Sequence, residues 1–276
     1  MKPLALLIFS CLQQYVVAQG FVEPFRIDDA ERANDIRHTR DEILKHSPST
    51  LNPWEGKYSG DFGTDTYTSI FVSVKHGIAT NEHGVSGVHA GNCGVIEVKN
   101  SEIFVSFKYA EDQSTGFPTQ LLIVPWGDAY FLVPKGRIHG FCLDAKKGKP
   151  FLLSKAYCLE RTRPKKLEGL PSIPEKYKAC LSADAIKTHI INAKKAMIEK
   201  LPSGLLKITQ TVSLDCGEQA GVYVGMEFES SHPYAVLTVT NLDKTECTCA
   251  FESIEHPLSE IAEGLAIGML FGTVRY

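Results

Sequence analysis

Short hydrophobic runs dominate the chain, and their spacing is typical of β-strands. Between Trp54 and Glu160 the runs are rich in β-branched and aromatic residues, with Gly, Asn or Asp between them at intervals of roughly ten residues. In IFVSFKY, residues 103–109, alternate side chains share one face. The pattern predicts strands at 67–74, 94–98, 103–109, 121–124, 130–133 and 151–153. We expect an antiparallel barrel or sandwich.

Two segments have helical spacing instead. Residues 28–46 are dense in charge and carry a thin apolar stripe formed by Ala33, Ile36, Ile43 and Leu44, which predicts a surface helix before the first strand. The apolar residues of 183–201 fit both the helical and the strand spacing, and we expect a strand that leads into a short helix.

The β pattern returns towards the end of the chain. Strands are predicted at 206–214, 226–229, 235–240, 247–251 and 266–276. The sequence GVYVGM at 221–226 has an echo in GLAIGM at 264–269, and its glycines predict positive-φ turns into barrel strands. With the two prolines at 169–174 as a linker, the predicted parts are a signal peptide at 1–18, an N-terminal helical segment at 19–49, a β domain at 50–168 and a second β domain at 175–276.

The composition is that of a folded globular protein. Of 276 residues, 43% are hydrophobic and 22% are charged, which excludes disordered, collagen-like and polytopic membrane classes. The net charge of −3 argues against nucleic acid as a partner.

The first twenty residues indicate export. A positive Lys2, an apolar run at 4–9 and the small residues Val16 and Ala18 predict a signal peptide cut after Ala18, and hence a secreted or periplasmic protein. Lipid attachment at Cys11 is the alternative processing route. The apolar run is too short to span a bilayer, so we expect no transmembrane segment.

The segment VSLDCGEQAGVYVGM, residues 212–226, resembles a motif of small SH3-like β-barrel domains in exported bacterial envelope proteins. Residues 236–240 and 246–251 resemble the next two strands of such domains. The resemblance covers about sixty residues. It implies an SH3-like barrel that serves in interaction or scaffolding and carries no active site.

The first β domain resembles an uncharacterised group of exported bacterial proteins. The resemblance is carried by LNPWEGKY at 51–58 and by PWGDAYFLVP at 125–134. Trp54 close to a glycine at the first strand is also similar to the calycin barrels, a likeness that implies a carrier of small ligands. The order of the two residues is reversed relative to lipocalins.

One glycine-rich stretch holds candidate metal ligands. His76, His83, His89 and Cys93 fall within eighteen residues, and imidazole and thiolate are common zinc ligands. Their spacing matches no zinc finger, and solvated histidines in a hairpin loop are the other interpretation. No cofactor is predicted. A metal-dependent or thiol-dependent hydrolase that uses this stretch remains an alternative function.

The cysteines leave the disulfide pattern open. Removal of the leader leaves seven, an odd number. Lys146, Lys147, Gly148 and Lys149 form a turn signal between Cys142 and Cys158, which favours a bridge between these two, with Cys93–Cys142 as the competing pair. Cys216, Cys247 and Cys249 lie in β segments and are expected to be buried and free.

A basic stretch is the main charge anomaly. Residues 143–168 hold eight Lys or Arg against three acids. The candidate contact residues are Lys146, Lys147, Lys149, Lys155, Arg161 and Arg163, and an anionic envelope polymer, lipid headgroups or another protein would suit them. A solvated hairpin and linker explain the same charges. The sequence therefore favours a non-enzymatic, exported binding or scaffolding protein of the cell envelope or extracellular space, with the hydrolase and the small-ligand carrier as alternatives.

Overall fold

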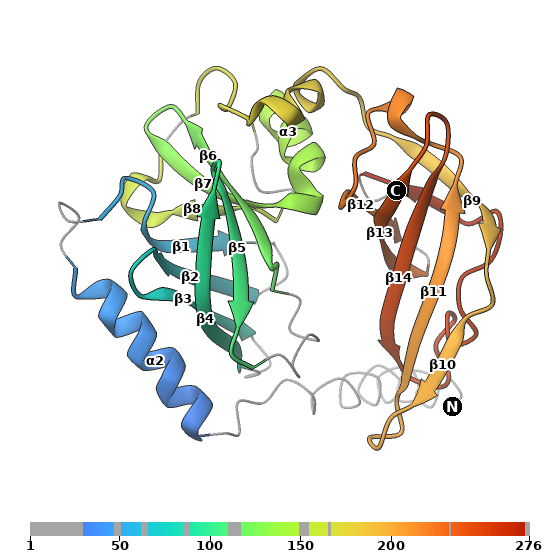
Figure 1. The fold of residues 1–276 in the computed structure, drawn as a ribbon, viewed down its shortest axis with the longest axis horizontal. Coiled ribbons are helices and arrows are strands. Elements are labelled where there is room, and N and C mark those ends of the chain that lie inside the picture. Colours follow the sequence, from blue (N-terminus) through green and yellow to red (C-terminus); the bar gives the residue numbers. More distant parts are fainter. Residues whose placement is uncertain are drawn as a thin grey trace, which may run out of the picture.

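A computed structural model of the chain describes residues 30–46, 51–61, 66–84, 89–109, 117–148, 155–164, 167–231 and 233–273. The side chains of residues 61, 66, 67, 82–84, 89, 90 and 231 lie outside this description. The fold is mainly β, with two closed antiparallel barrels side by side and a helix before the first (Figure 1). The predicted fold class is confirmed at this level. An SH3-like or calycin-like relationship stays a prediction.

The first barrel has eight strands in the order of the sequence, so each strand pairs with its neighbour along the chain. Antiparallel pairing of Tyr58 with Leu159 and of Ser59 with Cys158 joins the last strand to the first and closes the barrel. The strands are β1 (Gly56–Asp61), β2 (Thr66–Ser73), β3 (Gly77–Gly84), β4 (His89–Lys99), β5 (Glu102–Phe107), β6 (Gln120–Trp126), β7 (Ala129–Pro134) and β8 (Tyr157–Leu159).

Alternation along these strands divides the side chains between two cores. One set forms a buried cluster that includes Tyr58, Ile70, Ile103 and Leu132, contributed by strands around the whole barrel. On β6, Leu121 and Ile123 belong to this cluster. Leu122 and Val124 alternate with them, face the other side of the sheet and are fully buried in a second cluster. The run LLIVPW at 121–126 is therefore continuously hydrophobic, because both faces of β6 are covered.

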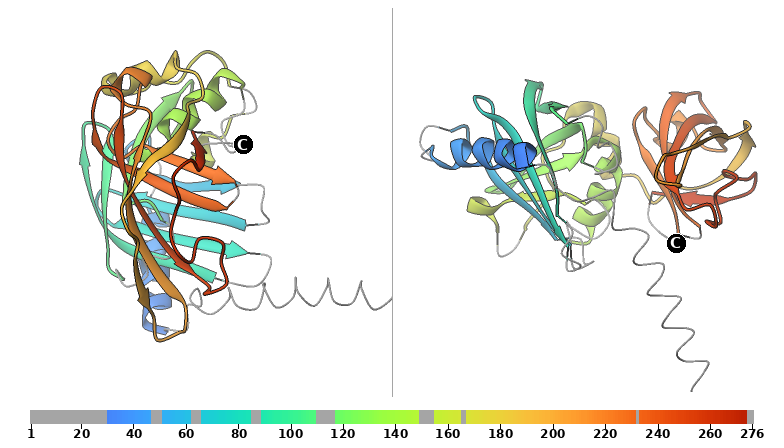
Figure 2. Two further views of the ribbon diagram at one scale, coloured as in Figure 1. Left: turned by 90° about the vertical axis from the view of Figure 1, so that its right-hand side faces the viewer. Right: turned by 90° about the horizontal axis from the view of Figure 1, so that it is seen from below.

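Helices cover the outside of this barrel in two places (Figure 2). Helix α2 (Ala30–Leu44) lies on β2, β3 and β4, where Ile36 and Ile43 pack against Phe71, Ala79 and Cys93. The predicted surface helix is therefore present. Of its thin stripe, Ile36 and Ile43 are buried, Ala33 is half-buried and Leu44 is exposed. Helix α3 (Ile138–Lys146) and the 3-10 helix η6 (Glu175–Leu181) cover β6 to β8 on the side that faces the second barrel.

Two elements of the first domain differ from the prediction. Strand β3 stands where a glycine-rich loop was expected. It pairs with β2 on one side and β4 on the other, so its backbone N–H and C=O groups have hydrogen-bond partners in the sheet. Helix α3 replaces the expected hairpin around Cys142: Ile138, Phe141, Cys142 and Ala145 have helical spacing and all pack against the barrel. The predicted strand at 151–153 lies outside the described residues.

The second barrel is closed by six strands in the order β11, β14, β13, β12, β15 and β9, and β9 returns to β11. Strand β10 pairs with the first half of β11, and β9 pairs with its last three residues. The strands are β9 (Lys187–Ala193), β10 (Met197–Lys200), β11 (Leu206–Leu214), β12 (Glu227–Ser231), β13 (Tyr234–Leu242), β14 (Cys247–Glu255) and β15 (Leu270–Gly272). Strand β10 stands where a short helix is expected from the sequence.

The repeated glycine motif has the predicted backbone role. Gly221 and Gly225 have φ of 81° and 89°, and Gly264 and Gly268 have φ of 97° and 86°. Residues with side chains rarely adopt these angles. Each glycine pair leads the chain into a strand, β12 in the first case and β15 in the second.

The segment between the barrels packs on the first one. The Ser172 amide donates a hydrogen bond to the Pro125 carbonyl at 2.8 Å, and Ile173, Tyr177 and Cys180 belong to the cluster beneath α3. Contacts of the first barrel thus extend beyond the predicted linker at 169–174. The positions of the domain boundaries stay predictions. None of the helices in the described part of the chain is both long enough and apolar enough to cross a membrane.

Candidate functional site

A groove runs between the two barrels and has contributions from both. Its volume is about 680 Å³. The first barrel supplies residues 117–120, 134–137, 155 and 157, and the second supplies residues 224, 225, 227 and 238–240. Pockets of this size at domain junctions are common ligand sites.

One arginine, whose side chain is largely buried, joins the two sides of this groove. Arg137 ends the short 3-10 helix η4 (Lys135–Arg137) between β7 and α3, and its side chain is 10% exposed. Its Nε lies 2.5 Å from Glu227 Oε2, and its Nη1 lies 2.7 Å from Glu229 Oε1. Burial opposes the charge, but the two carboxylates outweigh it and raise the pKa of Arg137. This guanidinium is a permanent cation that couples the first barrel to β12.

The backbone at Gly136 allows this approach. A Cβ atom added there would lie 2.6 Å from Cγ and Oε1 of Glu227, which is closer than non-bonded carbon atoms come. Beside the ion pairs, the Tyr223 hydroxyl donates a hydrogen bond to the Lys135 carbonyl at 3.0 Å. The rings of Tyr177 and Tyr223 meet edge to face with centroids 5.2 Å apart. The junction therefore combines charge, hydrogen bonding and aromatic packing.

Two lysines give the groove cationic groups of its own. Lys155 Nζ lies 3.9 Å from Glu229 Oε1, and its side chain is 44% exposed. Lys135 lines the groove and makes no ion pair with the described residues. The hydroxyls of Thr119, Thr238 and Thr240 and the amide of Gln120 add neutral hydrogen-bonding groups. Glu227, the one acid among the described lining residues, is paired with Arg137.

The predicted metal ligands are placed along the length of a hairpin. His76 precedes β3 and His83 lies near its other end, so roughly 20 Å of strand separates their backbones. His83 and His89 are paired across β3 and β4, but their side chains are outside the described residues. Cys93 points to the opposite side of β4 from Asn92 and packs under α2. The backbone does not bring all four residues to one point.

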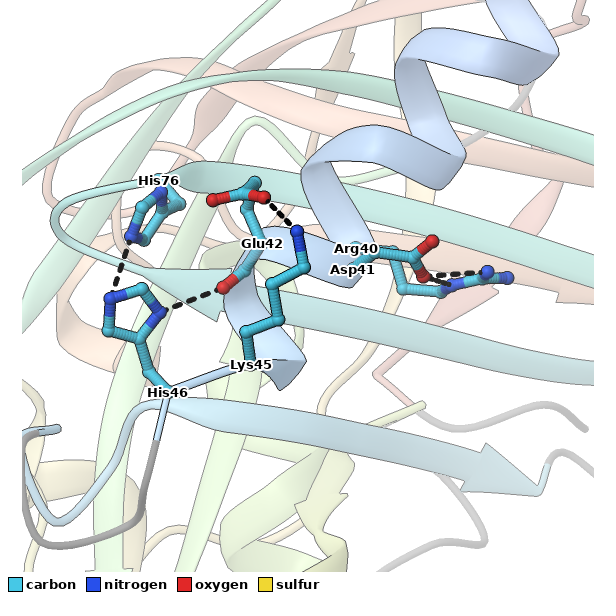
Figure 3. Close-up of polar contacts among 6 residues, drawn as sticks. All are labelled: Arg40, Asp41, Glu42, Lys45, His46 and His76. Carbon is cyan, nitrogen blue, oxygen red and sulfur yellow. Dashed lines mark hydrogen bonds and ion pairs between the residues drawn. The ribbon is translucent and has the colours of Figure 1, made fainter.

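His76 has a different histidine as its neighbour. Figure 3 shows the ring of His46, at the end of α2, facing His76, with Nε2 atoms 3.3 Å apart. His46 Nδ1 donates to the Glu42 carbonyl at 2.8 Å, which leaves Nε2 of the neutral ring to accept from His76. Burial and then His46 lower the pKa of His76. No group of three or more candidate metal ligands occurs among the described residues.

Cys93 lies in a smaller pocket of about 470 Å³ between α2 and the barrel, lined also by Asp35, His38, His76 and Lys108. Burial, together with the charge of Asp35, raises the pKa of Cys93. A raised pKa keeps the thiol protonated, whereas nucleophilic cysteines require the thiolate. The pocket thus collects residue types that a hydrolase uses, in an electrostatic setting that disfavours attack by the thiol.

The predicted basic contact residues do not form one patch. Lys146 Nζ donates to the Ala183 carbonyl at 2.5 Å, and Arg161 donates to the carbonyls of Asn52 and Pro53 at 3.0 and 2.7 Å. Lys147 lies at the end of α3, Arg163 follows the 3-10 helix η5 (Glu160–Thr162), and Lys149 is outside the described residues. Of the six, Lys155 lines the groove.

The predicted disulfide between Cys142 and Cys158 is not formed in the structure, where both thiols are free and buried. Helix α3 places Cys142 instead in one buried cluster with Cys180, where each thiol shifts the pKa of the other. Cys93 lies under α2 and not beside Cys142. Cys216, Cys247 and Cys249 are buried and free, as predicted.

Sequence reasoning did not identify Arg137, Glu227 and Glu229. They are single charged residues far apart in the chain, and no motif marks them. The available signal is two acids at alternate positions of a short strand, with the buried Phe228 between them. Comparison with protein families, curated proteins and solved structures finds no match for this chain.

Proposed function

We propose that this chain is a non-enzymatic, exported binding protein that holds an anionic, hydroxyl-rich polymer of the cell envelope, such as an acidic glycan, in the groove between its barrels. The observation that carries the proposal is the lining of this groove. Lys135 and Lys155 offer cations, and three threonines and one glutamine offer hydrogen bonds. Such groups bind anionic oxygens and hydroxyls.

The shape of the groove suits a segment of a chain. Both barrels line it, and its volume of about 680 Å³ is sufficient for a few sugar or glycerol phosphate units. The half-buried ring of Phe117 adds apolar surface on which a sugar ring could stack. The Arg137 ion pairs fix both walls in place before a ligand arrives, which reduces the ordering cost of binding.

The lining also favours binding over chemistry. A hydrolytic site needs a positioned acid, base or nucleophile, and among the described residues the one acid that lines the groove is held by Arg137. This is the reason for preferring the binding function over the hydrolase alternative.

The experiment measures the affinity of the purified chain for a glycerol phosphate oligomer and for an acidic oligosaccharide by isothermal titration calorimetry. Removal of one charge-assisted hydrogen bond should weaken binding by about tenfold, so Lys135→Gln and Lys155→Gln should each raise Kd by about that factor. Lys200→Gln is the matched control, because Lys200 is exposed on β10 in the second barrel, away from the groove. Equal Kd values for all three variants, or no binding of either polymer, would contradict the proposal.

A further inference from the structure

Two buried thiols from separate elements meet on the outer side of the first barrel. Cys142 lies in α3 and is fully buried, and Cys180 lies in η6 and is 4% exposed. Both belong to one hydrophobic cluster, α3 and η6 pack directly on each other, and the two thiols are close enough for each to shift the pKa of the other. Sulfur atoms in such contact can be joined with small side-chain movements.

The position of this pair matters for the junction between the barrels. Helix α3 follows η4 directly, and η4 carries Arg137 and Lys135 of the groove. Cys180 lies in the segment that enters β9, the first strand of the second barrel. Tyr177, one turn earlier in η6, contacts Tyr223 of the second barrel. A link between α3 and η6 would therefore anchor the segment that connects the barrels.

We propose that Cys142 and Cys180 are a disulfide site, and that their oxidation fastens the connecting segment to the first barrel. The oxidant is the disulfide of an exported thiol oxidoreductase or of oxidised glutathione. The thiolate of one cysteine attacks this disulfide and releases one thiol. The second cysteine then displaces the other thiol, and the S–S bond forms with loss of two protons and two electrons from the pair. The oxidant is reduced to two thiols.

The exchange takes place during folding, because both thiols are buried once η6 has docked on α3. At that stage either thiolate can attack first, and the other cysteine resolves the mixed disulfide.

The bridge would close a loop of about 40 residues, from 142 to 180. Loop closure of that length lowers the population of the unfolded state on the order of several hundredfold, provided that the bond is unstrained. The oxidised protein should therefore resist denaturation and proteolysis at residues 165–185 more than the reduced protein does.

A single tryptic digest tests the assignment. The purified chain is refolded in a glutathione redox buffer, free thiols are blocked with N-ethylmaleimide, and the digest is analysed by mass spectrometry. Trypsin places Cys142 in IHGFCLDAK, Cys158 in AYCLER and Cys180 in ACLSADAIK, so each cysteine has its own peptide. The expected product is IHGFCLDAK joined to ACLSADAIK, with a mass two hydrogens below the sum of the separate peptides.

The variants separate this inference from the binding proposal, because the digest needs no ligand. Cys180→Ser should remove the cross-linked peptide, and Cys158→Ser, the matched control, should retain it. IHGFCLDAK joined to AYCLER, or IHGFCLDAK and ACLSADAIK both fully blocked after refolding in the oxidising buffer, would overturn the assignment. If the variants fold poorly, the digest of the unaltered chain decides alone.

Discussion

Mild acid should destabilise this protein through His139, which lies in α3 beneath the junction of the barrels. The side chain is 1% exposed, and neither ring nitrogen makes a hydrogen bond of ordinary geometry. Burial, with a smaller contribution from Lys146, lowers the pKa of His139 to about 4, and the backbone of Asp184 opposes part of this shift. The folded protein therefore keeps this imidazole neutral.

The sign and size follow from proton linkage. In the unfolded chain His139 should titrate near pH 6.5, so between about pH 6.5 and pH 4 the unfolded state binds more protons than the folded state. Stability is present above pH 6.5 and is lost as the pH falls. With a folded pKa of about 4, linkage gives a loss of about 2 kcal/mol between pH 7.5 and pH 5.

Urea unfolding at several pH values tests this effect, and Trp126 is a suitable fluorescent reporter because it packs against Phe141 of α3. His139→Leu and His139→Asn cannot titrate, so each should lack about 2 kcal/mol of the pH dependence that the unaltered chain shows. His256→Gln, at an exposed site, is the matched control and should keep that dependence. Because Asp35, Glu42 and Asp215 also have lowered pKa values, their contributions are lost at lower pH. The same slope in both His139 variants and in the unaltered chain would refute the reasoning.

Two further predictions concern the junction. Arg137→Ala leaves two carboxylates without their cationic partner and should lower the free energy of unfolding by about 3–5 kcal/mol. The control Lys200→Ala should change this free energy by less than about 0.5 kcal/mol. Equal effects of the two variants in urea unfolding would contradict the role of Arg137. Gly136→Ala places a methyl group against Glu227 and should uncouple the barrels, so that calorimetry shows two transitions in place of one. Lys200→Ala, at an exposed site on β10, should keep the unaltered profile. An unchanged Gly136→Ala profile would exclude this contact as essential.

The sequence predicts the strands in which inward apolar residues alternate with outward polar ones. It is less informative for strands whose inward side chains are mostly polar. Strand β11 begins and ends as predicted, because three of its four inward residues, Ile208, Val212 and Leu214, are apolar. The fourth, Gln210, is buried through hydrogen bonds that it donates to the Lys194 and Leu265 carbonyls. Strand β3 was missed, since its inward Thr80 is buried through hydrogen bonds with the backbone of Asn92 and not through apolar character. Local composition does not reveal such a pairing partner.

Helix α3 and the groove show a second limit of prediction. The Lys146–Lys149 stretch has a strong turn signal, and it does follow α3, but the signal does not distinguish the end of a helix from the tip of a hairpin. Arg137 and Glu229 meet only because two separate barrels pack together. The charge of the basic stretch was visible in the sequence, whereas the contacts that separate Arg161 from Lys155 depend on the tertiary structure.

Hydrogen exchange with and without the polymer is the most direct test of the proposed binding site. The chain is compared at saturating glycerol phosphate oligomer and in its absence, with exchange followed by mass spectrometry. The account predicts slower exchange at residues 134–137, 223–227 and 238–240, the segments that form the two walls of the groove. Protection confined to α2 or β10, or no change in the groove segments at saturation, would contradict it.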